Sequence, residues 1–403
     1  MTLPLDVLKI LETLESHGFE GYAVGGCVRD YLMGNTPLDY DLTTDATPTD
    51  MMQMFEKTID TGANFGTITV MMGQMAYELT TYRTETGYDD FRKPSEVAFS
   101  TDILEDLQRR DFTMNAIAYH PAKGYVDPYG GRADIEAKVV RAVGEPAERF
   151  TEDALRMLRC LRFAAKLDFA IDSLTYTAIL TCKPLIAHIS IERIREELVK
   201  MLMADKVEKM QALTTTGLLE PVDKALAEHL RTHLSTALPQ VKEAPKSLNI
   251  RLALLFMADP APKKQLTFLK CSNAQMKEIT QLIENSHRPI AGNDRYGLKR
   301  LLLALGEETT EKLLVIKTNQ GEDVLRAKEV LADILAKKEP LTLKELAIDG
   351  GVLINEGITK AGKALGELLN HLHEQVLKAP ELNQREALLD MAKTFAQERK
   401  CES

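Results

Sequence analysis

The chain has 403 residues, which at roughly 150 residues per domain leaves room for two to four domains and excludes a single small module. Fifty lysines and arginines against sixty aspartates and glutamates give a net charge of −10, so contact with nucleic acid requires a local basic patch. The five cysteines show no CxxC spacing, which indicates a reduced protein without a disulfide framework. No apolar run approaches the ~18 residues of a membrane span, so we expect a cytoplasmic protein without membrane contact.

The composition of the chain changes near residue 140. Before it, short runs of β-forming residues separated by turn residues predict strands over residues 21–24, 38–43, 67–72, 76–82 and 115–119. After it, apolar residues recur at spacings of three and four between prolines, which predicts helices over residues 154–167, 191–203, 248–257, 298–305, 327–335 and 364–376. We therefore expect an α+β fold, with a mixed α/β head followed by an all-α remainder.

Two aspartates, Asp39 and Asp41, lie in the predicted strand 38–43. Because side chains alternate along a strand, both carboxylates should share one face, while Leu38 and Leu42 point to a core on the other face. Two carboxylates on one face suit the pair of Mg²⁺ ions, about 3.5–4 Å apart, that two-metal phosphoryl chemistry requires. The alternative is a solvated strand face.

A glycine pair, Gly25-Gly26, follows the first predicted strand and precedes a helical stretch. Backbone N–H groups can approach a triphosphate closely there, because glycine has no Cβ. With twelve residues between Gly26 and Asp39, the combination resembles the signature of the polymerase-β nucleotidyltransferase superfamily. Glu78, in the predicted strand 76–82, is the best candidate for a third catalytic acid, although an exposed strand glutamate fits the pattern equally well.

Two further segments carry arginines that could serve such a site. Arg109-Arg110-Asp111 precedes a predicted strand, and a guanidinium group suits a triphosphate, although such a pair also forms structural salt bridges. In the predicted helix that begins near residue 152, the ionic residues Asp153, Arg156, Arg159 and Arg162 recur every three positions. A basic solvated face explains this stripe equally well.

The pair Asp153 and Arg156 could also read a nucleobase. Cytosine and adenine share an amino donor beside a ring-nitrogen acceptor, whereas guanine and uracil present the reverse pattern. An aspartate accepts from the amino group and an arginine donates to the ring nitrogen. Neighbours at positions i and i+3 of one helix could therefore select CTP and ATP without a nucleic-acid template.

At this level of detail the chain resembles the class II, bacterial, CCA-adding tRNA nucleotidyltransferases. The resemblance runs through five ordered blocks: GGCVRDYLMGNTPLDYDLTTDA (25–46), RRDFTMNAIAY (109–119), DPYGGRADI (127–135), EDALRMLRCLRFAAKL (152–167) and ISIERIREEL (189–198). It implies template-independent addition of C, C and A to the 3′ end of tRNA from CTP and ATP, with Mg²⁺ as cofactor. The tRNA would be held by its 3′ end and its acceptor and T arms, and a homodimer is left open.

The resemblance also implies a role for each candidate residue. It gives the metals to Asp39 and Asp41, the triphosphate to Gly26, Arg29 and Arg110, the base to Asp153 and Arg156, and support of the nucleotide to Arg159 and Arg162. Gly130-Gly131 would make the head–neck junction mobile, and residues 81–94 look like the flexible loop of the family. The implied domains are a nucleotidyltransferase head over residues 1–140, a neck for nucleobase recognition over 141–205, a body over 206–290 and a tRNA-binding tail over 291–403.

Several alternatives are weighed against this prediction. A poly(A) polymerase shares the head, but this chain lacks the arginine pair and phenylalanine of that group just after Asp-x-Asp. A partial CC- or A-adding enzyme is the other alternative, and CC-only enzymes lack part of the flexible loop, which has no deletion here. A phosphohydrolase with an HD module is disfavoured, since none of the eight histidines precedes an aspartate. The intact acids Asp39 and Asp41 argue against a non-catalytic RNA-binding module. Lys299 and its neighbour Arg300 are expected as solvated residues or contacts to tRNA phosphate.

Overall fold

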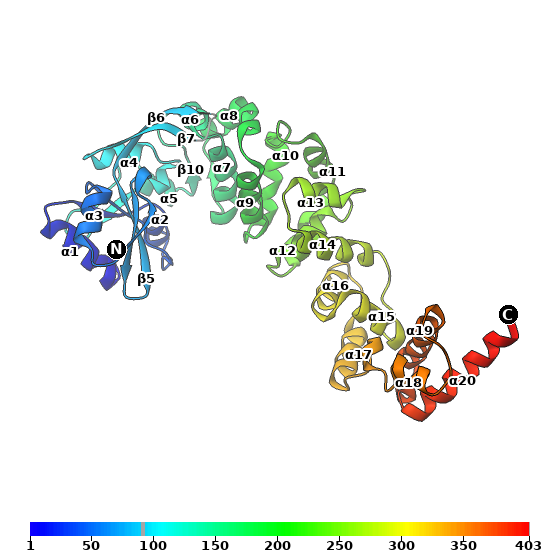
Figure 1. The fold of residues 1–403 in the computed structure, drawn as a ribbon. Helices are drawn as coiled ribbons and strands as arrows, with labels where there is room; N and C mark the ends of the chain where they lie inside the picture. The colour runs from blue at the N-terminus through cyan, green and yellow to red at the C-terminus, as the bar shows by residue number, and fades with distance from the viewer. Residues whose placement is uncertain (90–92, 403) are drawn as a thin grey trace. The chain divides into compact units, whose positions relative to one another are not determined.

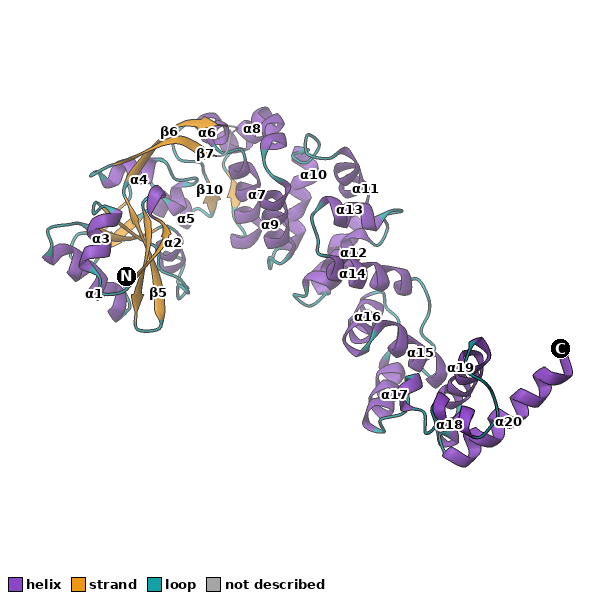
Figure 2. Ribbon diagram, in the orientation of Figure 1, coloured by secondary structure: helices purple, strands orange, loops and turns teal. Residues whose placement is uncertain are grey.

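The computed structural model describes residues 1–89 and 93–402. Figures 1 and 2 show the strands confined to the N-terminal part of the chain and helices along the rest, which confirms the expected fold class. The contacts divide the chain into two compact units. The first consists of residues 1–242 with 264–270, and the second of residues 243–263 with 271–403.

A seven-stranded mixed sheet forms the centre of the head, in the order β3-β4-β5-β2-β1-β8-β9. Its strands are β1 (Gly21–Val24), β2 (Leu42–Thr44), β3 (Thr58–Gly62), β4 (Thr67–Met72), β5 (Met75–Thr81), β8 (Ala118–His120) and β9 (Gly124–Val126). All four residues of β1 are buried, because this strand lies inside the sheet. Strand β2 pairs antiparallel with β1 and parallel with β5. The sheet therefore places the end of β1 beside the start of β2.

The prediction of a strand over residues 38–43 was wrong at its start, because β2 begins only at Leu42. Leu38, expected in the core, is 91% exposed. Strand β1 ends at Val24, whose N–H donates to the carbonyl of Asp41, and the chain then turns away at Gly25 with φ +76°. Residues 38–40 consequently have no partner along β1. The strand predicted over residues 115–119 is also only partly right, since a 3₁₀ turn over Thr113–Asn115 precedes β8.

The helices of the first unit lie between the strands and continue after them. They are α1 (Leu5–Ser16), α2 (Gly26–Leu32), α3 (Pro48–Met54), α4 (Ile103–Gln108), α5 (Gly131–Glu136), α6 (Pro146–Glu152), α7 (Leu155–Leu167), α8 (Ser173–Cys182), α9 (Ile191–Leu202), α10 (Ala212–Thr216) and α11 (Lys224–Glu243). A short parallel pair, β10 (Val139–Val140) with β11 (Ala170–Ile171), adds a small sheet to the helical neck. The segment expected as a flexible loop contains the antiparallel strands β6 (Arg83–Asp89) and β7 (Lys93–Phe99), while its residues 90–92 lie outside the described residues.

The second unit is helical and has two apolar cores. Its helices are α12 (Leu248–Phe256), α14 (Asn273–Ser286), α15 (Arg295–Leu305), α16 (Glu307–Asn319), α17 (Leu325–Ala336), α18 (Gly350–Asn355), α19 (Lys363–Lys378) and α20 (Arg385–Glu402), and α13 (Pro262–Phe268) spans the boundary between the units. One core includes Leu298 and Leu331, and the other includes Leu353 and Leu372. The helices predicted after residue 140 are all confirmed, to within three residues at each end.

A fully buried lysine, Lys299 of α15, lies between these cores. Its ammonium group donates to the carbonyl of Leu377 in the last turn of α19 and pairs with Glu339 at 2.6 Å. The expectation of a solvated lysine or a phosphate contact was therefore wrong. The residue instead satisfies a helix terminus, which gives a buried cation the partners that it requires.

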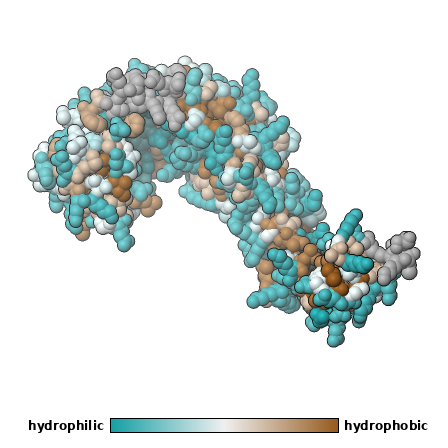
Figure 3. Space-filling view, in the orientation of Figure 1, coloured by the Kyte–Doolittle hydropathy of each residue, from teal (hydrophilic) through white to brown (hydrophobic). Residues whose placement is uncertain are grey.

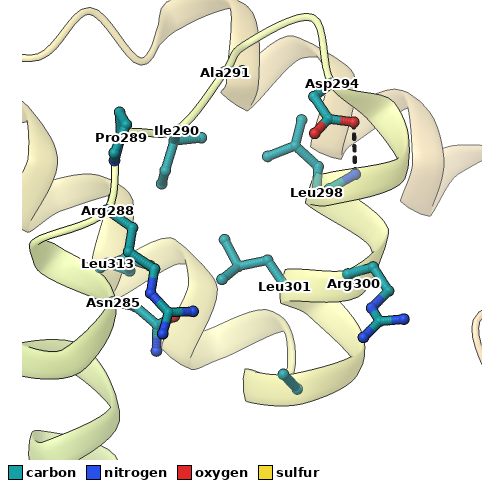
Figure 4. Close-up of a pocket in the computed structure, with 12 residues that line it drawn as sticks. Asn285, Arg288, Pro289, Ile290, Ala291, Asp294, Leu298, Arg300, Leu301 and Leu313 are labelled. Carbon is teal, nitrogen blue, oxygen red and sulfur yellow. Dashed lines mark hydrogen bonds between the residues drawn. The ribbon is translucent and has the colours of Figure 1, made fainter.

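A cleft of about 340 Å³ opens in the second unit, between the end of α14 and helix α15. Figure 4 shows the guanidinium groups of Arg288 and Arg300 at two sides of this cleft, with Leu301 between them. Surface side chains elsewhere are mainly hydrophilic on the face drawn in Figure 3. Within the described part of the chain, every helix is too short or too polar to cross a membrane.

The close contact of Gly131 with the 3₁₀ turn over Thr113–Asn115 allows the packing of the head to be tested by substitution. A Cβ at this position would lie 2.1 Å from the carbonyl oxygen of Thr113, so α5 can approach the 3₁₀ turn only with glycine there. We expect Gly131→Ala to lower the free energy of unfolding by about 1–3 kcal/mol, as overpacking does. The control is Gly366→Ala in α19, where the added Cβ meets no atom within 4 Å. Thermal unfolding of both variants checks this, and equal melting temperatures would contradict the packing role.

Candidate active site

The glycine pair and two arginines meet where β1 passes into α2. A Cβ on Gly25 would lie 3.0 Å from Nη1 of Arg110, and one on Gly26 would lie 3.8 Å from Nη2 of Arg29. Arg29 is 4% exposed and donates to the side chains of Asp30 and Asn115. The structure therefore brings three of the predicted triphosphate residues, Gly26, Arg29 and Arg110, to one place. Glycine is required at position 25 because its φ is positive and the guanidinium group is close.

A buried carboxylate holds Arg110 in this position. Asp106 of α4 is fully buried and accepts from Arg109 at 2.6 Å and from Arg110 at 3.0 Å. Burial alone would raise the pKa of Asp106, but the charges of the two arginines outweigh it and the pKa is lowered. The residue is therefore ionised, and it leaves one side of the Arg110 guanidinium group available toward Gly25.

The two aspartates of the Asp-x-Asp motif are exposed at the start of β2. Although Asp41 is exposed, partial desolvation raises the pKa of its carboxyl; the charge of Arg110 opposes this shift and that of Asp39 adds to it. In the parallel pairing of β2 with β5, Leu42 lies opposite Leu79. Asp41 and Glu78 are the residues directly before this pair. Neighbouring strands lie about 4.8 Å apart, so the backbone of Glu78 lies one strand away from that of Asp41.

These carboxylates fit a magnesium site of a particular kind. Among the described residues, no three His, Cys, Asp or Glu side chains converge to form a complete cage for a metal ion. Magnesium commonly takes only one or two protein carboxylates and completes its shell with water and substrate phosphates. Asp39 and Asp41 have the oxygen donors that such a site needs.

The break between α6 and α7 changes the expected geometry of the base-reading pair. Helix α6 ends at Glu152 and α7 begins at Leu155, so Asp153 lies between two helices and not on the helix of Arg156. The prediction of one helix through all four ionic residues was therefore wrong. The backbone of Asp153 is extended, and its carboxylate accepts from the N–H of Leu155 at 3.0 Å. An aspartate favours such capping over a helix interior.

Both members of this pair have partners that the sequence analysis missed. Arg193 of α9 donates to Asp153 at 2.8 Å. Arg156 donates to Glu152 at 2.5 Å and to the carbonyl of Arg109 at 2.8 Å. Arg193 lies within the block 189–198, but helical periodicity alone could not show that α9 faces Asp153.

The remaining arginines of α7 pair with one carboxylate before the neck and one within it. Arg159 donates twice to Asp111 of the head, at 2.5 and 2.8 Å, and Asn115 donates to the same carboxylate. Arg162 donates to Glu197 of α9 at 2.5 Å. Burial would raise the pKa of Asp111, but Arg159 and the hydrogen bond from Asn115 lower it to about 2. Asn115 and Glu197 are functional candidates that pattern reasoning did not identify.

The comparisons with known proteins agree with this arrangement. Residues 21–141 match the poly A polymerase head domain, residues 168–230 match the RNA- and SrmB-binding site of polymerase A, and residues 245–392 match domain 2 of tRNA nucleotidyltransferases. The mixed sheet with its glycine pair and Asp-x-Asp motif thus defines a nucleotidyltransferase. Enzymes of this class generally use a divalent metal.

Full-length relatives specify the family further. The CCA-adding enzyme of Lactobacillus delbrueckii subsp. bulgaricus is 36% identical over 388 residues, covering 95% of this chain and 96% of that enzyme. The enzyme of Lactobacillus helveticus is 38% identical over 397 residues, covering 95% of each chain. This chain belongs to the family of CCA-adding enzymes, the tRNA nucleotidyltransferases that the resemblance predicted.

Solved structures support the same conclusion. The Bacillus stearothermophilus CCA-adding enzyme in complex with CTP has a TM-score of 0.84 and 31% identity, covering 100% of both chains. The Thermotoga maritima CCA-adding enzyme complexed with tRNA has a TM-score of 0.62 and 19% identity, covering 98% of this chain and 96% of that chain, which shows the shared fold alone.

The ion pair of Asp111 predicts a defined dependence of stability on pH. Its pKa of about 2 lies below the value of about 3.9 expected in the unfolded chain, so its contribution is complete above pH 5 and is lost as the pH falls toward 2. Asp111→Asn should lower the free energy of unfolding by roughly 2 kcal/mol at pH 7. Denaturant unfolding from pH 7 to pH 2.5 measures the difference between wild type and variant. A difference that stays constant over this range would contradict the ion-pair contribution.

Proposed function

We propose that this chain adds C, C and A in order to the 3′ end of tRNA, using CTP and ATP and releasing pyrophosphate. The observation that carries the proposal is an Asp-x-Asp motif in a nucleotidyltransferase head, followed by helical segments, in a chain that matches a CCA-adding enzyme over 95% of its length. The neighbour bound to CTP and the neighbour bound to tRNA are consistent with both substrates. The homodimer and the cytoplasmic location stay predictions.

The reaction forms one bond to phosphorus, breaks one bond to phosphorus and releases the proton of the 3′-hydroxyl group to solvent. The 3′-hydroxyl oxygen of the tRNA bonds to the α-phosphorus of the nucleotide, the bond from that phosphorus to the bridging oxygen breaks, and pyrophosphate leaves with the electron pair. Asp39 and Asp41 are the residues that would hold Mg²⁺, which would lower the pKa of the hydroxyl and neutralise charge on the phosphates. Glu78, one strand away, is the third acid in this proposal.

The arginines position the nucleotide. The Arg29 and Arg110 guanidinium groups beside Gly25 and Gly26 suit the triphosphate, because they offer several N–H donors in fixed geometry. Asp153 would accept from the amino group of cytosine or adenine, and Arg156 would donate to the ring nitrogen. In the structure both side chains are held by Arg193, Glu152 and a backbone carbonyl, so a bound base must replace some of these contacts.

The domain roles are part of the same proposal. The head over residues 1–140 would carry the transfer chemistry, the neck over 141–205 the base recognition, and the body over 206–290 and the tail over 291–403 the tRNA. The cleft with Arg288 and Arg300 supports a role of the second unit in binding RNA, since exposed guanidinium groups beside apolar side chains suit phosphates and unstacked bases (Figure 4).

The first test is an extension assay on tRNA that ends at the discriminator base, with CTP alone, ATP alone and both together. Wild type should add two residues with CTP and three with both, whereas a poly(A) polymerase would extend with ATP alone and a partial enzyme would stop early. Asp39→Ala and Asp41→Ala should abolish transfer, and Glu78→Gln should slow it strongly without changing the choice of base. The exposed control Glu56→Ala should retain wild-type activity. Substantial activity of either aspartate variant would refute the metal assignment.

A second test distinguishes recognition of the base by Arg156 from an effect of its positive charge alone. If Arg156 pairs with the ring nitrogen, Arg156→Ala leaves that acceptor unpaired, and discrimination against GTP and UTP should shrink by roughly 1–3 kcal/mol. The same measurement of kcat/KM for all four nucleotides applies to Asp153→Ala. Arg141→Ala, which removes a neck arginine paired with Asp134 and Asp172, serves as the control and should leave selectivity intact. An equal loss for all four nucleotides in Arg156→Ala would show that the residue acts only through charge.

A further inference from the structure

Phe163 of α7 has three guanidinium groups around its ring. The ring centroid lies 5.3 Å from the guanidinium carbon of Arg29, 5.5 Å from that of Arg159 and 3.8 Å from that of Arg162. All three distances are within the range of about 6 Å over which the negative face of an aromatic ring attracts a cation. The residue is only 5% exposed, and its ring meets that of Phe112 edge to face at 5.7 Å.

The three cations come from two different helices. Arg29 belongs to α2, which begins at the glycine pair, whereas Arg159 and Arg162 belong to α7 of the neck. Each also pairs with its own carboxylate: Arg29 with Asp30, Arg159 with Asp111 and Arg162 with Glu197. The ring of Phe163 contacts all three guanidinium groups, so it links the two helices.

A further cation, Lys166, lies close to this cluster. Burial, followed by the charge of Arg29, lowers the pKa of the Lys166 ammonium; Asp30 opposes the shift and Arg162 adds to it. Guanidinium groups so close together repel one another; each pairs with a carboxylate, and Arg29 also donates to Asn115. An aromatic face supplies attraction from another direction without neutralising the charge that a triphosphate would meet.

We propose that Phe163 is a positioning residue for the incoming nucleotide, its ring holding the Arg29 guanidinium group in register with the arginines of the neck helix. The inference rests on the proposed function, because it takes Arg29 as a triphosphate ligand. Loss of the aromatic face should release Arg29 and weaken the binding of CTP and ATP, while tRNA binding and the chemical step change little. An apolar side chain that only filled the core would give no such pattern.

Fluorinated phenylalanines at position 163 provide the test, since fluorine withdraws electron density from the ring face and changes its size little. In full-length protein carrying one, two or three ring fluorines, KM for CTP and for ATP should rise stepwise while kcat and the Kd for tRNA stay near wild type. Phe163→Leu should raise both nucleotide KM values roughly 2- to 30-fold, the range of one or a few cation–π contacts. The control is Phe150→Leu, which changes another fully buried phenylalanine and should lower the melting temperature without raising these KM values.

The outcomes are distinct. Nucleotide KM values that do not change across the fluorine series would overturn the positioning role, even if Phe163→Leu is impaired through lost packing. Equal rises of KM in Phe163→Leu and Phe150→Leu would also overturn it. An inactive wild-type enzyme would instead refute the proposed function, so the two failures cannot be confused.

Discussion

The ion pair between Asp111 and Arg159 is the contact on which the geometry of the site depends. It joins a buried carboxylate of the head to the first long helix of the neck, and Asn115 donates to the same carboxylate. Asn115 also accepts from Arg29, so one chain of hydrogen bonds runs from the neck helix to the helix that follows the glycine pair. Breaking one member of a buried pair leaves an uncompensated charge, which makes this connection costly to lose.

Other ion pairs around the site also join an arginine to a carboxylate. Asp106 holds Arg109 and Arg110, Glu197 holds Arg162, and Arg193 holds Asp153. A chain with a net charge of −10 thus concentrates arginines in one region and constrains them with carboxylates that are mostly buried. This arrangement presents positive charge to an anionic nucleotide. Because the carboxylates keep the arginine side chains in fixed orientations, these side chains need to reorganise less when the substrate binds.

The contrast between arginine and lysine in this molecule follows from their chemistry. The site uses arginines, whose planar group can bond a carboxylate on one edge and contact a ring or a phosphate with the rest. Among the described residues of the second unit, the two most deeply buried cations are lysines. Lys299 caps the end of α19, and Lys317 donates to the carbonyl of Ser286 in α14 and to Glu322. A compact ammonium group suits a single backbone carbonyl, so these lysines serve the fold and not the substrate.

Local sequence was sufficient for the change from strands to helices near residue 140 and for the helices after it, and it proposes the motif residues. Periodicity and motif spacing depend on neighbouring residues, so they can be read without a structure. The start of β2, the exposure of Leu38, the break before Asp153 and the burial of Lys299 depended on the tertiary structure. Each is set by a distant partner, such as the end of β1 or the last turn of α19. The sequence by itself therefore determined which residues could do the chemistry, and only the fold decided which of them meet, because sheet register and helix packing bring together groups that are far apart along the chain.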